Sequence, residues 1–336
     1  MSMCGCGTSQ SELSSAEESD SVGQVRDVFA MDTFMSLKAY GTGADTALVQ
    51  AEQRIMELES LLSVNDENSD VYKVNNAHGE AVSVSSDTLE LVGAAVEYGN
   101  KTDGALDVTL YPILKLWGFT SDVKQVANAQ DIENTLSLVD YKQISVDGDS
   151  VKVPENVQID FGALAKGYTG DCVIDILKKN NVRSAIINLG GNVQTLGSKP
   201  DGSPWRVAVQ NPQNTSQHIC VLGVSDAAVI TSGSYERYFV GDDGKRYWHI
   251  LDAKDGYPAD SGLVSVTVVG PSGLRCDALS TALFVMGADS AIEYWRSDGG
   301  FQMILITDDG IIYYTVGLEN AIEFSGGIEY EIKMIG

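Results

Sequence analysis

The residues best suited to chemistry lie between Ile159 and Asp171, where an acid, a lysine and three glycines follow a short apolar run. The run Val157–Phe161 is typical of a strand and the residues after Gly162 follow a helical pattern, so we expect a strand that turns into a helix. A helix start offers free N–H groups and a positive dipole end to an anion. Lys166 adds a mobile cation there, and Asp160 adds an acceptor for a base, a ribose or a cation. The alternative is an ordinary junction, with Asp160 as a cap and Lys166 in solvent.

A second pair of chemical groups lies on the helix expected over Leu274–Met286. Asp277 and Thr281 are four residues apart, so the carboxylate and the hydroxyl project from one helix face. Hard oxygen ligands of this kind suit Mg²⁺, which keeps waters and shares phosphate oxygens. The alternative is a helix cap plus a hydroxyl bonded to its own backbone.

His249 is a third candidate, within the segment Trp248–Asp252. A lone histidine among aromatic and aliphatic residues is more often a satisfied core residue than a catalyst. The local sequence leaves both interpretations open.

Composition limits the partners of the chain. Its 336 residues can bury a core, and a hydrophobic content of 43% is ordinary for a globular protein. With 22 basic and 47 acidic residues the net charge is −25, which disfavours binding to nucleic acid or to an anionic membrane. A dinucleotide would be repelled as well, so its phosphates would need a local cation, and this favours a divalent metal.

The amino-terminal residues 1–23 differ from the rest. Cys4 and Cys6 precede a Ser/Glu-rich segment that is too polar to fold alone, which predicts a disordered tether before a folded domain at 24–336. A cysteine followed by a polar tether also favours a lipid anchor that remains after removal of a signal peptide. We therefore expect a location outside the cytoplasm, anchored by lipid to a bacterial membrane.

The elements that position these residues mix strands and helices. We expect a strand over Val25–Tyr40, a helix with Ala51, Ile55, Leu58 and Leu62 on one stripe, and a helix capped by Asp87. The segment after Gly162 should remain helical to Lys179, and strand-rich segments with hairpins follow from Ser184. A strand rather than a helix follows Gly190-Gly191, which argues against a Rossmann fold. The order of elements predicts an α+β fold of mixed antiparallel sheets with flanking helices.

Taken together, the chain resembles the ApbE family of FAD:protein FMN transferases over about residues 27–316. Each motif is weak alone, but in this order the set is highly specific. In chain order the motifs are Met31-Asp32-Thr33, Asp103–Thr109 with Pro112 and Leu116–Phe119, Asp160–Asp171, Asn188–Asn192, Ser232–Phe239, His249–Asp252 with Gly256-Tyr257-Pro258, and Asp277–Thr281.

The resemblance implies an ApbE-like, T-fold-related architecture of two closely packed α/β halves, and an activity. Family members bind FAD and Mg²⁺, transfer FMN through its phosphate to a Ser or Thr of an acceptor flavoprotein, and release AMP. By resemblance, the metal ligands would be Asp277, Thr281 and the carbonyl of Ala163. His249, Asp277 and Lys166 would be catalytic, with His249 as the candidate base. The residues implied around FAD are Met31, Asn65, Ala105, Leu106, Asp107, Asp160, Lys166, Ser234, Arg237, His249, Ile250 and Leu251.

One departure from the family leaves alternatives open. Many relatives carry an aromatic residue at the place of Asn65, where it can stack on the flavin. Asn65 cannot, which makes an FAD pyrophosphatase releasing FMN and AMP the second interpretation. A non-catalytic flavin-binding lipoprotein is the third, and the intact pair Asp277 and Thr281 argues against it.

Overall fold

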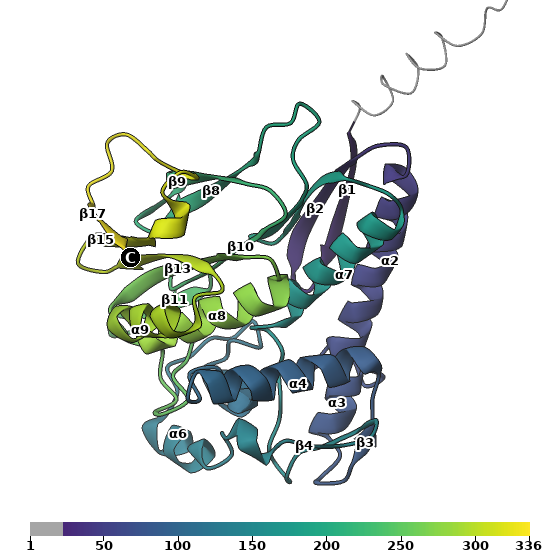
Figure 1. Ribbon diagram of the computed structural model, residues 1–336. Coiled ribbons are helices and arrows are strands. Elements are labelled where there is room, and N and C mark those ends of the chain that lie inside the picture. The colour runs from purple at the N-terminus through teal and green to yellow at the C-terminus, as the bar shows by residue number, and fades with distance from the viewer. Residues whose placement is uncertain (1–22) are drawn as a thin grey trace, which may run out of the picture.

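The computed structural model describes residues 23–336, and the predicted tether and its cysteines lie outside this range except for Gly23. The centre is a nine-stranded sheet in the order β1-β2-β6-β7-β10-β13-β14-β15-β17 (Figure 1). Neighbouring strands are antiparallel except β15 and β17, which are parallel. The strands are β1 (Gln24–Ala30), β2 (Thr33–Tyr40), β6 (Ser184–Leu189), β7 (Asn192–Leu196), β10 (Ala228–Gly233), β13 (Leu263–Gly270), β14 (Gln302–Thr307), β15 (Ile311–Thr315) and β17 (Glu331–Ile335).

Three small sheets and the helices complete the α+β fold. The small sheets join β3 (Val82–Ser83), β5 (Ser150–Lys152) and β4 (Ser145–Asp147); β16 (Ile322–Phe324), β9 (Asn214–Val224) and β8 (Trp205–Asn211); and β11 (Tyr238–Val240) with β12 (Arg246–Trp248). The helices are α2 (Ala44–Leu62), α3 (Asp70–Asn75), α4 (Ser86–Lys101), α5 (Tyr111–Leu116), α6 (Ala129–Leu136), α7 (Ala165–Lys179), α8 (Gly273–Met286) and α9 (Ala288–Asp298). Among residues 23–336, no helix is both long and apolar enough to cross a bilayer.

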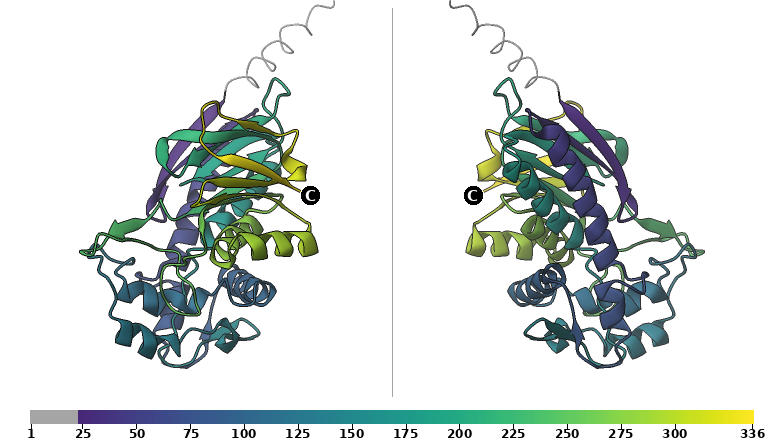
Figure 2. Two further views of the ribbon diagram at one scale, coloured as in Figure 1. Left: turned by 90° about the vertical axis from the view of Figure 1, so that its left-hand side faces the viewer. Right: turned by 90° about the vertical axis from the view of Figure 1, so that its right-hand side faces the viewer.

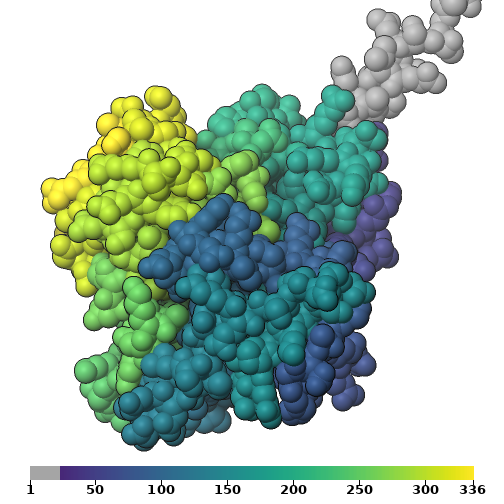
Figure 3. All heavy atoms as spheres, turned by 60° about the horizontal axis from the view of Figure 1, so that its bottom comes forward, coloured from purple at the N-terminus to yellow at the C-terminus, as the bar shows by residue number. Residues whose placement is uncertain are grey.

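The central sheet is covered on both faces. Helix α2 packs on β1 and β2, α7 packs on β6 and β7, and α8 packs on β10 and β13 (Figure 2). On β14, Met303 and Leu305 join the core that contains α8, whereas Ile304 and Ile306 join the core beneath β8 and β9. Consecutive apolar residues of this strand therefore meet two different layers, as expected for a strand buried on both sides. In the space-filling view from below, the blue and teal segment between α3 and α7 covers this end of the molecule (Figure 3).

The expected strand over Val25–Tyr40 is instead a hairpin. β1 and β2 pair in register from Gln24↔Ala39 to Ala30↔Thr33. Met31 and Asp32 form the two-residue turn with φ of 51° and 57°. Left-handed residues at both positions match the right-handed twist of the strands, and the usual Asn-Gly signal is absent here.

The predicted strand at Val157–Phe161 is also wrong, because these residues belong to no sheet. Their main chain is held by other partners. The Asn75 amide accepts from Ile159 N at 2.7 Å and donates to Ile159 O at 2.8 Å, and Asp160 N donates to Val108 O at 2.9 Å. The apolar run indicated burial correctly, but the Asn75 side chain and the 3₁₀ turn at Val108–Leu110 take the place of a neighbouring strand.

Other boundaries shift for local reasons. The cap of α4 is Ser85, whose Oγ accepts from Thr88 N, while Asp87 lies inside the first turn. The helices α3, α5, α6 and α9 were not expected. The expected helices around Ile55, Lys166 and Asp277 are confirmed as α2, α7 and α8, with Gly287 ending α8.

Candidate active site

The candidate site begins where α7 and α8 cross. Gly167 of α7 approaches α8 so closely that a Cβ there would lie 2.3 Å from the Gly273 carbonyl oxygen. The contact lets Gly167 N donate to Asp277 Oδ2 at 2.7 Å. Gln194 of β7 completes the crossing, because its Nε2 donates to Gly167 O at 3.0 Å. Glycine is therefore required here for close backbone approach.

Asp277 is a buried carboxylate with only 5% of its surface exposed. Burial raises its pKa, and the positive charge of Lys166, the Gly167 N–H and the Asn192 amide each act to lower it. Asp277 is not the cap of α8, so that alternative is wrong. The cap is Ser272, and Asp171 of α7 accepts from Gly273 N at 2.6 Å and Leu274 N at 3.0 Å.

The Ala163 carbonyl lies just before α7 and is free of the usual helix bond. The N–H four residues later belongs to Gly167, and it donates to Asp277 instead. Within residues 23–336, no backbone N–H donates to the Ala163 carbonyl. An oxygen acceptor without a helical partner is therefore left beside the start of α7, as the expected role of Ala163 requires.

Hydroxyl groups gather on the neighbouring part of α8. Ser232 Oγ of β10 lies 2.8 Å from Ser280 Oγ and 3.3 Å from Thr281 Oγ1. Ser280 Oγ also donates to the Asp277 carbonyl at 2.9 Å. No group of three or more His, Cys, Asp or Glu side chains in the described residues is arranged to hold a metal. A cation here would therefore depend on one carboxylate, hydroxyl and carbonyl oxygens, and a substrate phosphate.

Lys166 and Glu236 bring opposite charges to Asp277. Lys166 is half-buried and takes part in none of the ion pairs of the described residues, which leaves its ammonium available to an anion. Loss of hydration raises the pKa of Glu236 to about 7. The positive charge of Lys166 acts to lower this pKa, and the negative charge of Asp277 acts to raise it. Glu236 was missed as an individual site residue, and its only signal was its place in the motif Ser232–Phe239.

His249 follows β12 and is anchored to Arg237. Its backbone N and its ring Nδ1 both face the Arg237 carbonyl, at 3.1 Å and 3.2 Å. A carbonyl only accepts hydrogen bonds, so we assign the proton to Nδ1, which leaves Nε2 as the basic nitrogen. Burial, with the charges of Arg237 and Lys166, lowers the pKa of His249 to about 4. The imidazole is therefore neutral near pH 7.

Asp160 and Arg237 connect this group to the segment before α7. Asp160 Oδ1 accepts from Gly162 N at 2.9 Å, which closes a local turn before the helix. The N-cap of α7 is Leu164 and no side chain caps it, so the alternative of Asp160 as the helix cap is wrong. Burial raises the pKa of Asp160, while the Gly162 N–H and the charge of Arg237 lower it. Arg237 Nη2 also donates to Phe119 O at 3.1 Å.

The remaining expected FAD residues divide into turn residues and buried ones. Met31 N donates to Glu59 Oε1 at 2.7 Å, and Thr169 Oγ1 of α7 lies 3.8 Å from Met31 Sδ. Asn65 is exposed in the loop after α2. Asp107 Oδ1 accepts from Thr109 N at 2.8 Å and its Oδ2 from Tyr141 N at 3.1 Å. The side chains of Ala105, Leu106, Ser234, Ile250 and Leu251 are buried.

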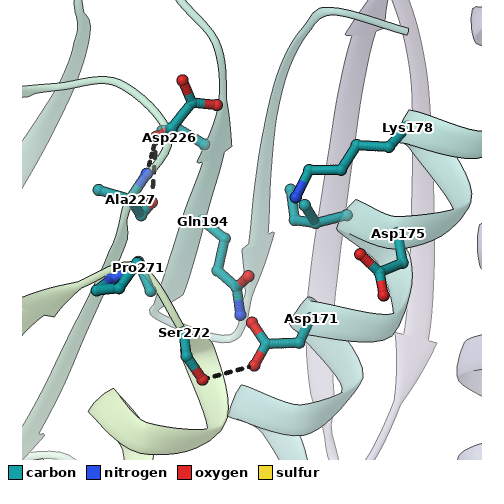
Figure 4. A pocket seen from close by; sticks show the side chains of 11 residues that line it. Asp171, Asp175, Lys178, Gln194, Asp226, Ala227, Pro271 and Ser272 are labelled. Atoms are coloured by element: carbon teal, nitrogen blue, oxygen red, sulfur yellow. Dashed lines mark hydrogen bonds between the residues drawn. The ribbon is translucent and has the colours of Figure 1, made fainter. Parts of the chain in front are cut away.

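Two small cavities lie outside the centre of this group. One cavity, of about 170 Å³, lies beside the helix crossing and is lined in part by Asp171, Gln194 and Ser272 (Figure 4). The other, of about 290 Å³, is lined in part by Ser234, Tyr235 and Arg246. Of the expected site residues, only Ser234 lines either cavity.

Comparison with known proteins identifies the class to which this fold and helix crossing belong. The model of the ApbE family matches residues 31–305, so the chain belongs to the ApbE family. A curated relative from Klebsiella pneumoniae, named FAD:protein FMN transferase, is 36% identical over 260 residues, which cover 76% of this chain and 80% of the relative.

Solved structures agree with the assignment. The crystal structure of the ApbE protein from Thermotoga maritima superposes with a TM-score of 0.81 at 33% identity, covering 91% of this chain and 97% of that one. The apo flavinyl transferase ApbE from Pseudomonas stutzeri gives 0.80 at 31% identity, covering 91% and 98%. The recognition from sequence motifs and the expected fold class are therefore confirmed.

Proposed function

We propose that this chain is a Mg²⁺-dependent FAD:protein FMN transferase that attaches FMN through its phosphate to a Ser or Thr of an acceptor protein and releases AMP. The observation that carries the proposal is the helix crossing. Because Gly167 N bonds to Asp277, a buried carboxylate and the free Ala163 carbonyl occur together at the start of α7. Family membership and the names of the relatives support the reaction.

The residues at the crossing fit a magnesium ion. Asp277, Thr281 and the Ala163 carbonyl are all hard oxygen donors, and Asp277 is too buried to remain ionised cheaply without a nearby cation. Such an ion, when bound, would neutralise phosphate charge and favour departure of AMP. With one carboxylate among the three donors, the site would require phosphate oxygens or water to complete it.

The chain's own residues account for the other requirements of phosphoryl transfer. The acceptor hydroxyl forms a bond to the FMN phosphorus as the bond from that phosphorus to the AMP oxygen breaks. His249 Nε2 receives the hydroxyl proton, since Nδ1 is held by the Arg237 carbonyl. The negative charge of a bound diphosphate would raise the pKa of His249 from about 4 toward neutrality. Lys166 places its ammonium against the phosphates.

The test is an incubation with FAD, Mg²⁺ and a recombinant flavoprotein domain that contains an acceptor Ser or Thr. We expect a covalent flavin band on the acceptor and one AMP released for each label. AMP without a labelled acceptor would favour the second candidate, FAD hydrolysis, which the exposed Asn65 supports because it offers no aromatic surface for the flavin. No AMP in the presence of Mg²⁺ would contradict both functions.

The proposed location is outside the cytoplasm, with a lipid anchor on Cys4 or Cys6. The support is the polar segment that follows these cysteines, in which Ser and Glu are frequent. Expression with a labelled fatty acid in a bacterial host should label the full-length chain. The double substitution Cys4→Ser with Cys6→Ser should remove the label and release the protein from membranes.

A further inference from the structure

Two aromatic side chains are exposed at the end of the β1–β2 hairpin. Phe29 is 60% exposed and Phe34 is 78% exposed. They are direct cross-strand partners, with ring centroids 5.1 Å apart. Their chain neighbours Val28 and Met35 are buried, so the two rings share the outer face of the hairpin. Two adjacent exposed rings form a small contiguous apolar surface, the kind of feature that a protein partner can cover.

A second apolar ridge lies on the β11–β12 hairpin. One face of this hairpin is packed, because Phe239 and Tyr247 stack at 5.4 Å and Phe239 meets Phe119 at 5.7 Å. The adjacent positions Tyr238 and Val240 are 40% and 60% exposed. Alternation along β11 therefore separates a face that anchors the hairpin from a solvent-exposed face, on which the Arg246 guanidinium lies over the Tyr238 ring at 4.4 Å.

Both ridges adjoin the candidate active site. The turn of the first hairpin places Met31 against Thr169 of α7, and the second hairpin leads directly into His249. The two hairpins project from the same side of the molecule in Figure 2. A protein that presents a hydroxyl group to this site from that side would meet both ridges.

Charge and free strand edges also suit a protein partner. The chain carries −25 in total, yet Gln24–Tyr40 contains two cations and two carboxylates, and Arg237–Trp248 contains three cations and two carboxylates. Local repulsion of an acidic partner is therefore smaller at the two hairpins than the net charge of the chain implies. In the described residues β1 pairs only with β2, and β11 and β12 form a sheet of two strands, so each hairpin keeps an unpaired edge for a further strand.

We propose that Phe29 and Phe34 together with Tyr238 and Val240, here named the paired ridges, form the docking surface for the acceptor protein. The inference rests on the proposed transfer to a protein, since FAD hydrolysis needs no such surface. Phenylalanine and tyrosine are typical of the buried centre of protein interfaces. The ridges would hold the acceptor while its Ser or Thr reaches the phosphorus beside His249.

The test compares Phe34→Ser and Val240→Asp with the matched control Val146→Asp. Val146 is 50% exposed on β4, which lies at the lower end of Figure 1, away from both hairpins. The acceptor is a flavoprotein domain that the wild-type protein labels. We expect the acceptor KM to rise about tenfold in each ridge variant, as for loss of an interface anchor. In both ridge variants the FAD affinity and the slow release of AMP without acceptor should equal those of wild type. The control Val146→Asp should leave the acceptor KM, the FAD affinity and the AMP release unchanged.

Other results would overturn the inference. An unchanged acceptor KM in both ridge variants, or a rise in only one, would contradict a paired surface. A parallel loss of AMP release without acceptor would mean that the ridges support the FAD site instead. Loss of binding to phosphatidylglycerol vesicles, or loss of self-association in sedimentation, with an unchanged KM would assign the ridges to a membrane or to a second copy. If wild-type protein releases AMP but labels no acceptor domain, the proposed transfer fails first, and that outcome is distinct from the others.

Discussion

Replacement of Gly167 by alanine tests the helix crossing on which the candidate site depends. The added Cβ would lie 2.3 Å from the Gly273 carbonyl oxygen and 2.6 Å from Asp277 Cβ. A carbon–oxygen contact normally requires about 3.3 Å, so the two helices would have to separate by roughly 1 Å. The first obstacle is backbone, which cannot rotate away. The bond from Gly167 N to Asp277 Oδ2, now 2.7 Å, would then be lost.

The expected destabilisation follows from three contributions. Overpacking costs about 1–3 kcal/mol. Leaving a buried N–H without its acceptor costs about 1–3 kcal/mol. The higher helix propensity of alanine returns about 1 kcal/mol. The free energy of unfolding should therefore fall by about 3 kcal/mol, within limits of about 1–5 kcal/mol.

Urea unfolding followed by far-ultraviolet circular dichroism measures this change, and Gly93→Ala is the matched control. Gly93 is an exposed residue inside α4, and a Cβ added to it would meet no neighbouring atom within 4 Å. Alanine there should raise the free energy of unfolding by about 0.5–1 kcal/mol. Wild-type stability in Gly167→Ala, together with the expected gain in Gly93→Ala, would refute the close crossing of α7 and α8.

Three further predictions concern the reaction. Asp277→Asn keeps an acceptor for the Gly167 N–H but removes the negative charge. Turnover should therefore fall at least 100-fold, as is typical for the loss of a key catalytic group, while the circular dichroism spectrum remains that of wild type. Retained turnover would exclude Asp277 as a metal ligand. Thr281→Val should raise the Mg²⁺ concentration for half-maximal activity while Thr281→Ser does not, and equal Mg²⁺ curves would contradict a ligand role for the hydroxyl. Because the pKa of His249 is lowered to about 4, kcat/KM for FAD should stay level as the pH falls from 8 to 5 and decline only near pH 4. A decline centred near pH 6.5 would show an imidazole that is not buried in this way.

Local patterns were sufficient for much of the fold. The stripe of Ala51, Ile55 and Leu58 is the buried face of α2, because burial of a helix repeats with its own period. Lys179 and Gly287 end α7 and α8 as their sequences indicate. The hairpin that joins β14 and β15 turns at Asp309-Gly310, a local turn signal. In each case the local structure is determined by a few residues that are adjacent in the sequence.

Sequence patterns gave wrong predictions where a backbone group or a side chain forms its hydrogen bonds with residues that are distant in the sequence. Val157–Phe161 has the apolar content of a strand, but the Asn75 amide occupies the main-chain groups of Ile159. Asp171 ends the motif Asp160–Asp171, yet its carboxylate accepts from Gly273 N and Leu274 N at the start of α8. No pattern within either segment reports such a bond.

The sequence alone determined which groups this protein has available: a glycine-rich helix start, a lysine beside it, a carboxylate and a hydroxyl one turn apart on another helix, and an ordered set of motifs shared with one family. The tertiary structure alone decided that Gly167 and Asp277, 110 residues apart, are joined by a hydrogen bond. It also brought Glu236 within the electrostatic influence of Lys166. The reason is physical: conformational preference acts over a few residues, whereas a bond between two helices exists only after packing has brought their backbones into contact.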